Sequence, residues 1–430
     1  MRLKDLARAL AGTAIGGLLS ACSPQDALAP TPAIYAGATA LAENSRPSGD
    51  GEDLSLVYVT DRAPVADPAT GALSYSAGRS PFMSFGTIDV DITPSTPTDT
   101  GKLKLGPVTE IGRFPGGPYT VEQTPKGFRR SPDDVAAHES AVAELQGEIR
   151  RRLATTQRKE VVLFIHGYNN TFDDAARTTG NICHYLGRDF VCVILTWPAG
   201  GKGVFMGYNI DRESSEFAVA DMKKAIRAVG ETEGVRAIHL IAHSRGTDVL
   251  TSALQQLLIE AYASRSSISQ QLKVRNVVLF APDIDIDVAA QKLSGLISDP
   301  DAHFGPKKNP NGVFPQGGLH VTVYSSPDDK ALGLSSFLFS SDLRLGQQDL
   351  DRPNTNALGG DPGHSGLFDF IEVNGTTDTF GHGYFLSNPA VSSDLVAMIR
   401  YGLKPGDPGR PLVEIKRSFW RVAGASASAQ

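Results

Sequence analysis

The chain has 430 residues, of which 41% are apolar, and this is enough for one large domain or two small ones. Its formal net charge is −6, and acidic and basic residues are interspersed without a run of five like charges. This pattern argues against a nucleic-acid-binding protein and against an acidic tail. Neither C-x-x-C nor H-E-x-x-H occurs, so we expect no metal and no other cofactor.

The first 22 residues have the features of an export signal. Basic residues outnumber acidic ones at the start, and the apolar run from 9 to 21 is too short to span a bilayer. The run ends in Leu19-Ser20-Ala21-Cys22, which resembles the lipobox of bacterial lipoproteins. That resemblance implies that Cys22 becomes the lipidated N-terminus and anchors the protein to a membrane. The alternative is an ordinary signal peptide in which Cys22 is incidental.

The residue after the cysteine is Ser23 instead of Asp. By resemblance to lipoproteins, this implies an outer-membrane anchor, with the protein facing the periplasm or the cell surface. Residues 23–52 are rich in Ala, Pro, Ser, Gly and Thr and are predicted to form a flexible tether. No second stretch is long and apolar enough to cross a membrane.

After the tether we expect one domain over residues 53–404, followed by a C-terminal tail over 405–430. Its first part, 53–130, is predicted to be a β-rich extension. The strands in it are expected at 54–59 and at 86–92, where apolar and polar residues alternate. Residues 93–130 are rich in Pro, Gly and Thr and are predicted to be irregular loop.

Beyond residue 133, stretches with helical spacing alternate with apolar runs. Runs that are apolar throughout are typical of strands buried on both faces, as in a parallel sheet. The pattern predicts an α/β fold with a mainly parallel central sheet flanked by helices. Strands are expected at 161–165, 190–196, 235–242, 274–281, 320–325 and 368–373, and helices at 134–155, 172–186, 214–229, 247–263, 287–296 and 389–401.

Two cysteines, Cys183 and Cys192, lie inside this alternating region. An exported protein folds in an oxidising compartment, where a disulfide between them is possible. Two buried thiols fit the sequence equally well.

The candidate nucleophile is Ser244. It lies in Ala242-His243-Ser244-Arg245-Gly246, directly after a predicted buried strand and directly before a predicted helix. This matches the G-x-S-x-G nucleophile elbow with Ala in place of the first Gly, and the small residues let the serine turn tightly above the sheet. The alternative is that Ser244 merely caps the helix.

The candidate oxyanion hole follows the strand at 161–165. The segment His166-Gly167-Tyr168-Asn169 resembles the HG-x loop of α/β-hydrolases, in which a backbone N–H binds the oxyanion. We predict that the backbone N–H groups of Tyr168 and Arg245 form the hole, while His166, Gly167 and Asn169 support the loop. The alternative is a plain polar turn.

The candidate acid is Asp329. The triad order Ser, acid, His places the acid after the strand at 320–325, where Asp328 and Asp329 are adjacent. Asp329 is preferred because a helix is predicted to follow it directly, although either aspartate could instead cap that helix. Asp283 and Asp285, one strand earlier, are the rival acids, and the role expected of them is helix or loop capping.

The candidate base is His382, which follows the last predicted strand and is flanked by Gly381 and Gly383. His364 precedes that strand and would emerge at the wrong edge of the sheet. His243 adjoins the nucleophile in sequence and should therefore point elsewhere.

These residues predict a serine hydrolase that cleaves carboxylic esters, either small acyl substrates or lipids of the cell envelope. An acyltransferase or amidase would use the same triad. A binding protein of the envelope that retains the fold without catalysis is the alternative from another class.

Several segments together resemble a family of bacterial α/β-hydrolases labelled domain of unknown function 900. The resemblance covers residues 53 to about 403 and implies an α/β-hydrolase fold with an esterase-like triad and no assigned substrate. Gly383 stands where the family pattern has Ser. The segments are Val59-Thr60-Asp61-Arg62-Ala63-Pro64, Phe85-Gly86, Phe164-Ile165-His166-Gly167-Tyr168-Asn169, Thr196-Trp197-Pro198, Ala242-His243-Ser244-Arg245-Gly246, Ala281-Pro282-Asp283-Ile284-Asp285 and His382-Gly383-Tyr384-Phe385.

Overall fold

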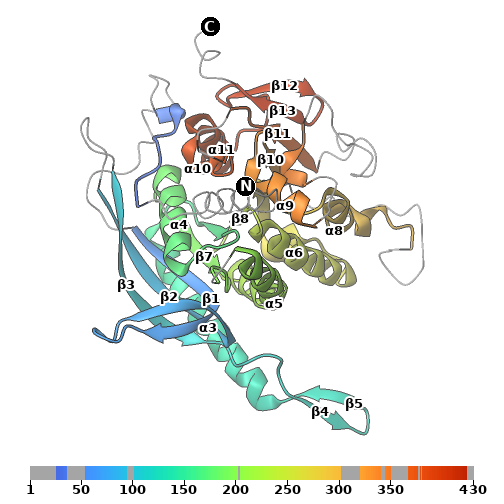
Figure 1. Cartoon of the computed structure of the whole chain (residues 1–430). Helices are drawn as coiled ribbons and strands as arrows, with labels where there is room; N and C mark the ends of the chain where they lie inside the picture. The colour runs from blue at the N-terminus through green and yellow to red at the C-terminus, as the bar shows by residue number, and fades with distance from the viewer. Residues whose placement is uncertain are drawn as a thin grey trace, which may run out of the picture.

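An eleven-stranded sheet forms the centre of the molecule in the computed structural model (Figure 1), in the order β12-β13-β11-β10-β9-β8-β6-β7-β1-β2-β3. The structure describes residues 26–35, 54–93, 101–201, 204–301, 320–339, 344–349, 367–375, 378 and 380–423. The strands of this sheet are β1 (Leu54–Ala66), β2 (Leu73–Thr93), β3 (Lys102–Arg113), β6 (Glu160–Ile165), β7 (Val191–Thr196), β8 (Ala237–His243), β9 (Val274–Phe280), β10 (His320–Ser325), β11 (Phe368–Glu372), β12 (Leu412–Lys416) and β13 (Phe419–Val422).

In the stretch β13-β11-β10-β9-β8-β6-β7-β1, every two neighbouring strands are parallel. Only the two edges are antiparallel, β2 and β3 on one side and β12 on the other. The predicted α/β fold with a mainly parallel sheet is confirmed. The carboxyl ends of the parallel strands therefore meet at one edge, where the candidate site residues are predicted to lie.

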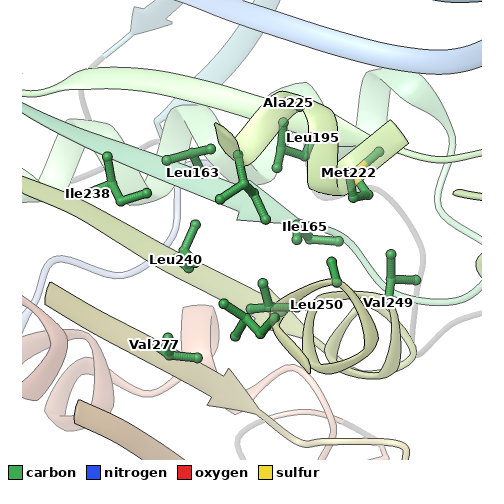
Figure 2. Packing of buried hydrophobic residues seen from close by; sticks show 14 of the residues in the cluster. Leu163, Ile165, Leu195, Met222, Ala225, Ile238, Leu240, Val249, Leu250 and Val277 are labelled. Atoms are coloured by element: carbon green, nitrogen blue, oxygen red, sulfur yellow. The ribbon is translucent and has the colours of Figure 1, made fainter. Parts of the chain in front are cut away.

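Helices cover both faces of the sheet. Strand β6 shows why: its residues are all buried except the partly exposed Glu160, and they alternate between the hydrophobic clusters of the two faces. Helices α3, α5, α6 and α8 pack on one face, part of which is shown in Figure 2, and α4 and α11 pack on the other. The helices are α3 (Pro132–Thr155), α4 (Phe172–Leu186), α5 (Val204–Gly230), α6 (Gly246–Ala263), α7 (Ile268–Leu272), α8 (Ile286–Ser298), α9 (Lys330–Phe339), α10 (Tyr384–Ser387) and α11 (Pro389–Tyr401).

The β-rich N-terminal part belongs to the same sheet instead of standing apart from it. Strand β1 pairs with β7 in parallel, and β2 and β3 extend the sheet outward. The prediction of irregular loop over 93–130 is wrong for Lys102–Arg113, which forms β3. Its side chains are largely exposed or half-buried because it is the edge strand, so the sequence carries little apolar signal there.

The predicted tether over 23–52 is packed where the structure describes it. Leu28 and Ala29 are buried, Leu28 N–H donates to the carbonyl of Gly101, and Ala29 N–H donates to the side chain of Asn181. A short 3-10 helix, η1 (Ala33–Tyr35), lies against α11. Residues 26–35 are therefore part of the folded domain. The predicted signal, Cys22 and the remainder of the tether lie outside the described residues, in which no helix is long and apolar enough to cross a membrane.

The predicted tail over 405–430 also contributes to the sheet. Phe419 is fully buried, and its strand β13 pairs in parallel with β11. Arg410, just before these strands, forms a buried double ion pair with Asp394 of α11. The tail was not predicted as structure because β12 is a short edge strand of five residues, most of them exposed. The hairpin β12–β13 closes this edge of the sheet.

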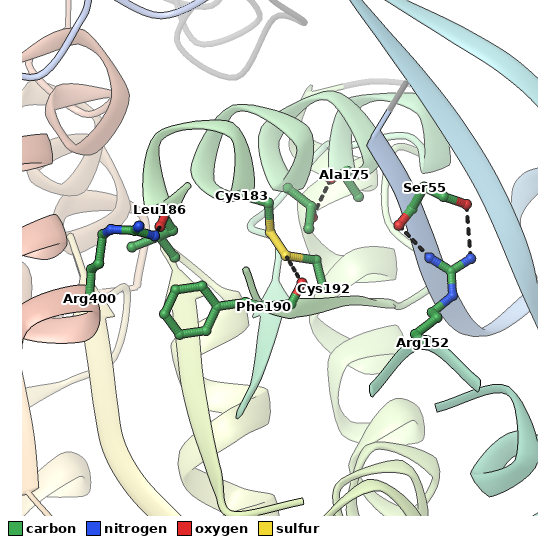
Figure 3. Close-up of a disulfide and its surroundings, with 9 residues drawn as sticks. Ser55, Arg152, Ala175, Cys183, Leu186, Phe190, Cys192 and Arg400 are labelled. Carbon is green, nitrogen blue, oxygen red and sulfur yellow. Dashed lines mark hydrogen bonds between the residues drawn. A yellow bond between two sulfur atoms is a disulfide. The ribbon is translucent and has the colours of Figure 1, made fainter. Parts of the chain in front are cut away.

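A disulfide joins Cys183 of α4 to Cys192 of β7 (Figure 3). Both residues are buried, and the two elements are consecutive in the chain. The sequence left open whether these cysteines are bonded or free, and in the structure they are bonded.

Candidate active site

Ser244 lies at the turn between β8 and α6, at the carboxyl edge of the parallel strands. Its φ is 52°, in the left-handed region that non-glycine residues rarely adopt. Its N–H donates to the carbonyl of Phe280 at 2.9 Å, and its carbonyl accepts from the Thr247 hydroxyl at 2.7 Å. The N-cap of α6 is Arg245, which makes no side-chain cap, so Ser244 is not the cap residue. Its strained turn fits a nucleophile elbow.

Two glycines allow the backbone to close around Ser244. A methyl group on Gly246 would lie 2.3 Å from the carbonyl oxygen of His166. A methyl group on Gly167 would lie 2.7 Å from the β-carbon of Ser244. The loop after β6 is therefore packed directly on the serine turn, and neither position has room for a side chain.

His166 braces this loop from within. Its Nδ1 donates to the carbonyl of Gly167 at 2.9 Å, so its Nε2 is the acceptor for Trp197 N–H at 3.1 Å. Burial and the guanidinium of Arg62 hold the pKa of His166 well below its ordinary value, so the ring is neutral. The indole of Trp197 stacks on the ring and donates to its backbone carbonyl. The position predicted as loop support thus connects β6 to β7.

Arg62 of β1 is a buried residue of this network that the prediction of the site did not include. Its guanidinium donates to the Thr196 hydroxyl at 2.8 Å, to the carbonyl of Ala199 at 2.8 Å and to the carbonyl of Asn170 at 2.6 Å. It lies within Thr60-Asp61-Arg62, one of the segments behind the family resemblance. A charged pair, Asp61-Arg62, that closely follows the apolar run of a predicted strand is the signal that could have identified it.

The loop residues Tyr168 and Asn169 are held from another side. Asn169 adopts a φ of 56°, and its N–H donates to the Asp211 carboxylate at 3.0 Å. The same carboxylate accepts from Gly200 N–H at 3.1 Å, so it joins the loops after β6 and β7. The ring of Tyr168 lies 5.1 Å from that of Tyr208 in α5. The structure thus places the predicted oxyanion loop beside the serine.

His382 and Asp329 are in direct contact. Nδ1 of His382 lies 2.7 Å from Oδ2 of Asp329, and both side chains are buried. The other carboxylate oxygen of Asp329 caps α9 by accepting from Leu332 N–H. Asp328 is exposed and accepts from Gly375 N–H instead. Of the two adjacent aspartates, the structure brings only Asp329 to the histidine.

The pKa values of this pair are set by burial and by mutual charge. Burial raises the pKa of the Asp329 carboxyl, and His382 beside it opposes that rise only in part. Burial would lower the pKa of His382, but the carboxylate of Asp329 and its hydrogen bond outweigh it and raise this pKa above its ordinary value. The imidazole is therefore a stronger base than an exposed histidine.

The loop that carries His382 is fixed by side chains that were not predicted. Asp378 accepts from the N–H groups of Phe380, His382 and Gly383 at 2.9–3.2 Å. The hydroxyl of Tyr384 donates to the carbonyl of Tyr324 and accepts from Ala281 N–H, both at 2.9 Å. An aspartate just before a glycine-rich loop is a known turn signal and could have indicated Asp378.

His243 connects the two halves of the site. Its Nε2 donates to the carbonyl of His382 at 3.2 Å, and its ring centroid lies 4.7 Å from that of His382. Burial and the neighbouring His382 hold the pKa of His243 well below its ordinary value. It was expected to point away from the serine. It lies on the elbow itself and contacts the histidine loop, which places His382 next to the Ser244 turn.

The rival acids have other partners. Asp283 is buried, and its carboxylate accepts from the Tyr208 hydroxyl at 2.7 Å and from the Ser335 hydroxyl at 2.8 Å, with Arg344 at 3.5 Å. Asp285 caps α8. His364, the rival base, lies outside the described residues. Among the residues that are described, no three His, Cys, Asp or Glu side chains form a group that could hold a metal ion.

Solved structures that are similar to this chain include two of low sequence identity. A lipase-esterase related protein from Clostridium acetobutylicum is 13% identical, covering 57% of this chain and 96% of its own, with a TM-score of 0.29. The carboxylesterase CesB from Bacillus subtilis is 10% identical, covering 61% of this chain and 100% of its own, with a TM-score of 0.28. No curated protein matches the chain.

The match to a protein family identifies the family of this chain, which the similarity to solved structures does not. A model of the family described as alpha/beta hydrolase of unknown function (DUF900) matches residues 141–400, which is more than half of the chain. The matched range contains Ser244, Asp329 and His382. With the sheet and the elbow already described, the conclusion is that this chain belongs to the α/β-hydrolase family with domain of unknown function 900.

Proposed function

We propose that the chain is a serine hydrolase that cleaves carboxylic esters through an acyl-enzyme, with Ser244, His382 and Asp329 as its triad. The observation that carries the proposal is the 2.7 Å contact between His382 Nδ1 and Asp329 Oδ2 in a buried loop cluster joined through His243 to the Ser244 turn. A buried ion pair that served stability alone would not need to adjoin a strained serine.

The chemistry follows from which imidazole nitrogen is engaged. Asp329 occupies Nδ1, so Nε2 is the nitrogen that accepts the proton of the Ser244 hydroxyl. The serine oxygen attacks the acyl carbonyl, and His382 returns the proton to the leaving alcohol. Water, deprotonated by His382, then attacks the acyl-enzyme. His382 returns that proton to the Ser244 oxygen as the acyl bond breaks, which releases the acid and free Ser244.

The negative charge on the tetrahedral intermediate needs donors on the opposite side of the carbonyl. We assign this role to the backbone N–H groups of Tyr168 and Arg245. Gly167 supports the assignment, because its close packing on Ser244 holds the Tyr168 loop near the reacting oxygen. Each such donor contributes roughly 3 kcal/mol to the transition state in serine hydrolases.

We further propose acyl esters or lipids of the cell envelope as substrates. The support is the export-signal pattern of residues 1–22 together with Ser23, from which we infer a lipoprotein anchored through Cys22 on the outer membrane, facing the periplasm or the cell surface. An amidase or acyltransferase would share the acyl-enzyme, and only the nature of the leaving group and of the acceptor would differ.

Covalent labelling tests the nucleophile. A fluorophosphonate probe should label the parent chain, and Ser244→Ala should remove the label together with roughly 10⁴-fold or more of the kcat on short p-nitrophenyl esters. Ser252→Ala, a serine on the neighbouring helix α6, is the control and should behave as the parent. Labelling that survives in Ser244→Ala would move the nucleophile elsewhere.

A substrate panel then tests the reaction class. Esters of graded acyl length, matched anilides and an added alcohol acceptor should give acid release from the esters, little from the anilides and little transfer. Dominant transfer to the alcohol would replace the hydrolase by an acyltransferase, while leaving the triad intact.

A further inference from the structure

The hairpin of β4 (Val121–Thr124) and β5 (Gly127–Arg130) projects from the body of the molecule at the start of α3 (Figure 1). Its two strands pair only with each other, as a separate two-stranded sheet. None of the residues in these two strands is buried. A two-stranded hairpin by itself is marginally stable in water. Its projection from the body of the molecule therefore calls for a structural or functional explanation.

The base of the hairpin is fixed to the domain. The Tyr119 hydroxyl contacts Nδ1 of His138 at 2.9 Å, and Lys224 of α5 lies over its ring. The N–H of Thr120 donates to Asp134 at 2.7 Å, and the N–H of Ser131 donates to the carbonyl of Thr120 at 2.9 Å. These contacts fix the orientation of the hairpin relative to the domain, while its two strands stay exposed to solvent.

One face of the hairpin is apolar and basic. The register pairs Val121 with Arg130 and Gln123 with Phe128, so these four side chains share one face. Phe128 is 79% exposed and Val121 is 60% exposed, the two highest values among the large hydrophobic side chains that the structure describes. Two exposed hydrophobic residues on the same small face are not a scattered surface pattern.

The charge of the hairpin is opposite to that of the chain. Lys126, Arg129 and Arg130 outnumber Glu122, which is paired with Arg129 on the other face. The chain as a whole has a formal net charge of −6. A basic projection on an acidic protein favours an anionic partner.

We propose that this hairpin docks on an anionic lipid surface, with Phe128 and Val121 inserted at the interface and Lys126 and Arg130 against the headgroups. The projecting shape supports a lipid surface over a protein groove, because an aromatic side chain flanked by basic residues can enter a bilayer interface without a matching cavity. This assignment does not depend on the proposed hydrolase activity.

Vesicle binding tests the proposal with the full chain carrying Cys22→Ser, which cannot be lipidated. It should sediment with phosphatidylglycerol vesicles and much less with phosphatidylcholine vesicles, and added salt should weaken the binding. Phe128→Ala should weaken it by about tenfold, and Arg130→Glu by a similar factor. Ile259→Ala and Arg236→Glu, at exposed positions elsewhere, share the same N-terminus and should bind as the parent.

A spectroscopic arm separates insertion from mere attraction. Phe128→Trp should shift its emission to shorter wavelength on phosphatidylglycerol vesicles, while Val413→Trp, on the exposed edge strand β12 of the large sheet, should not. Vesicle binding that is equal in the parent and in Phe128→Ala would overturn the proposal. A parent chain that fails to bind phosphatidylglycerol would also overturn it and favour a protein partner for the hairpin.

Discussion

The two halves of the candidate site are held in different ways. The serine half is fixed by the backbone: the Ser244 turn fits against the loop after β6 because Gly167 and Gly246 have no side chains. The histidine half lies on loops, and Asp378, Tyr384 and His243 hold it by hydrogen bonds. Steric packing tolerates almost no change, whereas a hydrogen-bonded loop can lose one contact and remain near its place. The difference predicts graded effects of substitution.

The largest effect should come from the acid of the histidine half. Asp329→Asn should lower kcat on p-nitrophenyl esters by roughly 10⁴-fold, because the wrong imidazole tautomer is then favoured. Asp328→Asn is the matched control, since Asp328 is exposed and contacts Gly375 instead. Equal and small losses in both variants would remove Asp329 from the mechanism.

The serine half should respond next, through packing. Gly167→Ala places a methyl group 2.7 Å from the β-carbon of Ser244, and we expect roughly a 10²-fold loss of kcat from displacement of the nucleophile. Gly246→Ala should also destabilise the fold, by about 3 kcal/mol in chemical denaturation. Gly147→Ala, in α3, meets only the end of the Arg150 side chain, at 3.9 Å, so it should leave kcat at the parent value and leave the stability unchanged or slightly raised. Parent-like activity in Gly167→Ala would refute the packing argument.

Loss of a loop contact should cost less. Asp378→Ala removes the acceptor of three N–H groups around His382, and we expect about a tenfold fall in kcat with little change in KM. Asp378→Asn keeps one acceptor oxygen, and its kcat should lie between those of the parent and of Asp378→Ala. If Asp378→Ala is as damaging as Gly167→Ala, the proposed contrast between the two halves is wrong.

The smallest effect concerns pH. The base must be neutral, so kcat/KM should rise with pH through the pKa of His382. This pKa is raised above its ordinary value because the negative charges of Asp329, Asp283 and Asp378 outweigh the effect of burial. The acid limb of the profile should therefore have its midpoint above the ordinary pKa of a histidine side chain. Asp378→Asn removes one of these charges and should move the midpoint to lower pH. An unchanged or raised midpoint would contradict this electrostatic account.

The central strands and the triad candidates could be predicted because both follow from local pattern. Strands such as β6 are apolar on both faces, and Ser244, Asp329 and His382 follow strand ends in the order typical of the fold. Strands β3 and β12 could not be predicted in this way, since they are edge strands with few buried side chains and lack the unbroken apolar run of a central strand.

The supporting residues of the site were missed for a related reason. Asp211 and Arg62 act by binding backbone groups of distant segments, and no spacing in the sequence records which backbone they reach. Asp378 binds N–H groups two to five residues ahead of it, so only a local turn pattern could have indicated it. His243 was interpreted only as a neighbour of the serine. Its contact with the carbonyl of His382 depends on how the loop after β11 folds back over β8.

Whether the bond between Cys183 and Cys192 has formed depends on the compartment in which the protein is produced. Thiols are kept reduced inside most cells, whereas a secreted chain meets oxidants as it folds. Material made in a reducing cytosol would therefore carry two buried thiols where α4 meets β7, and a thiol titration under denaturing conditions would distinguish it from the oxidised form. Enzyme assays on this protein are best compared between batches of the same thiol content.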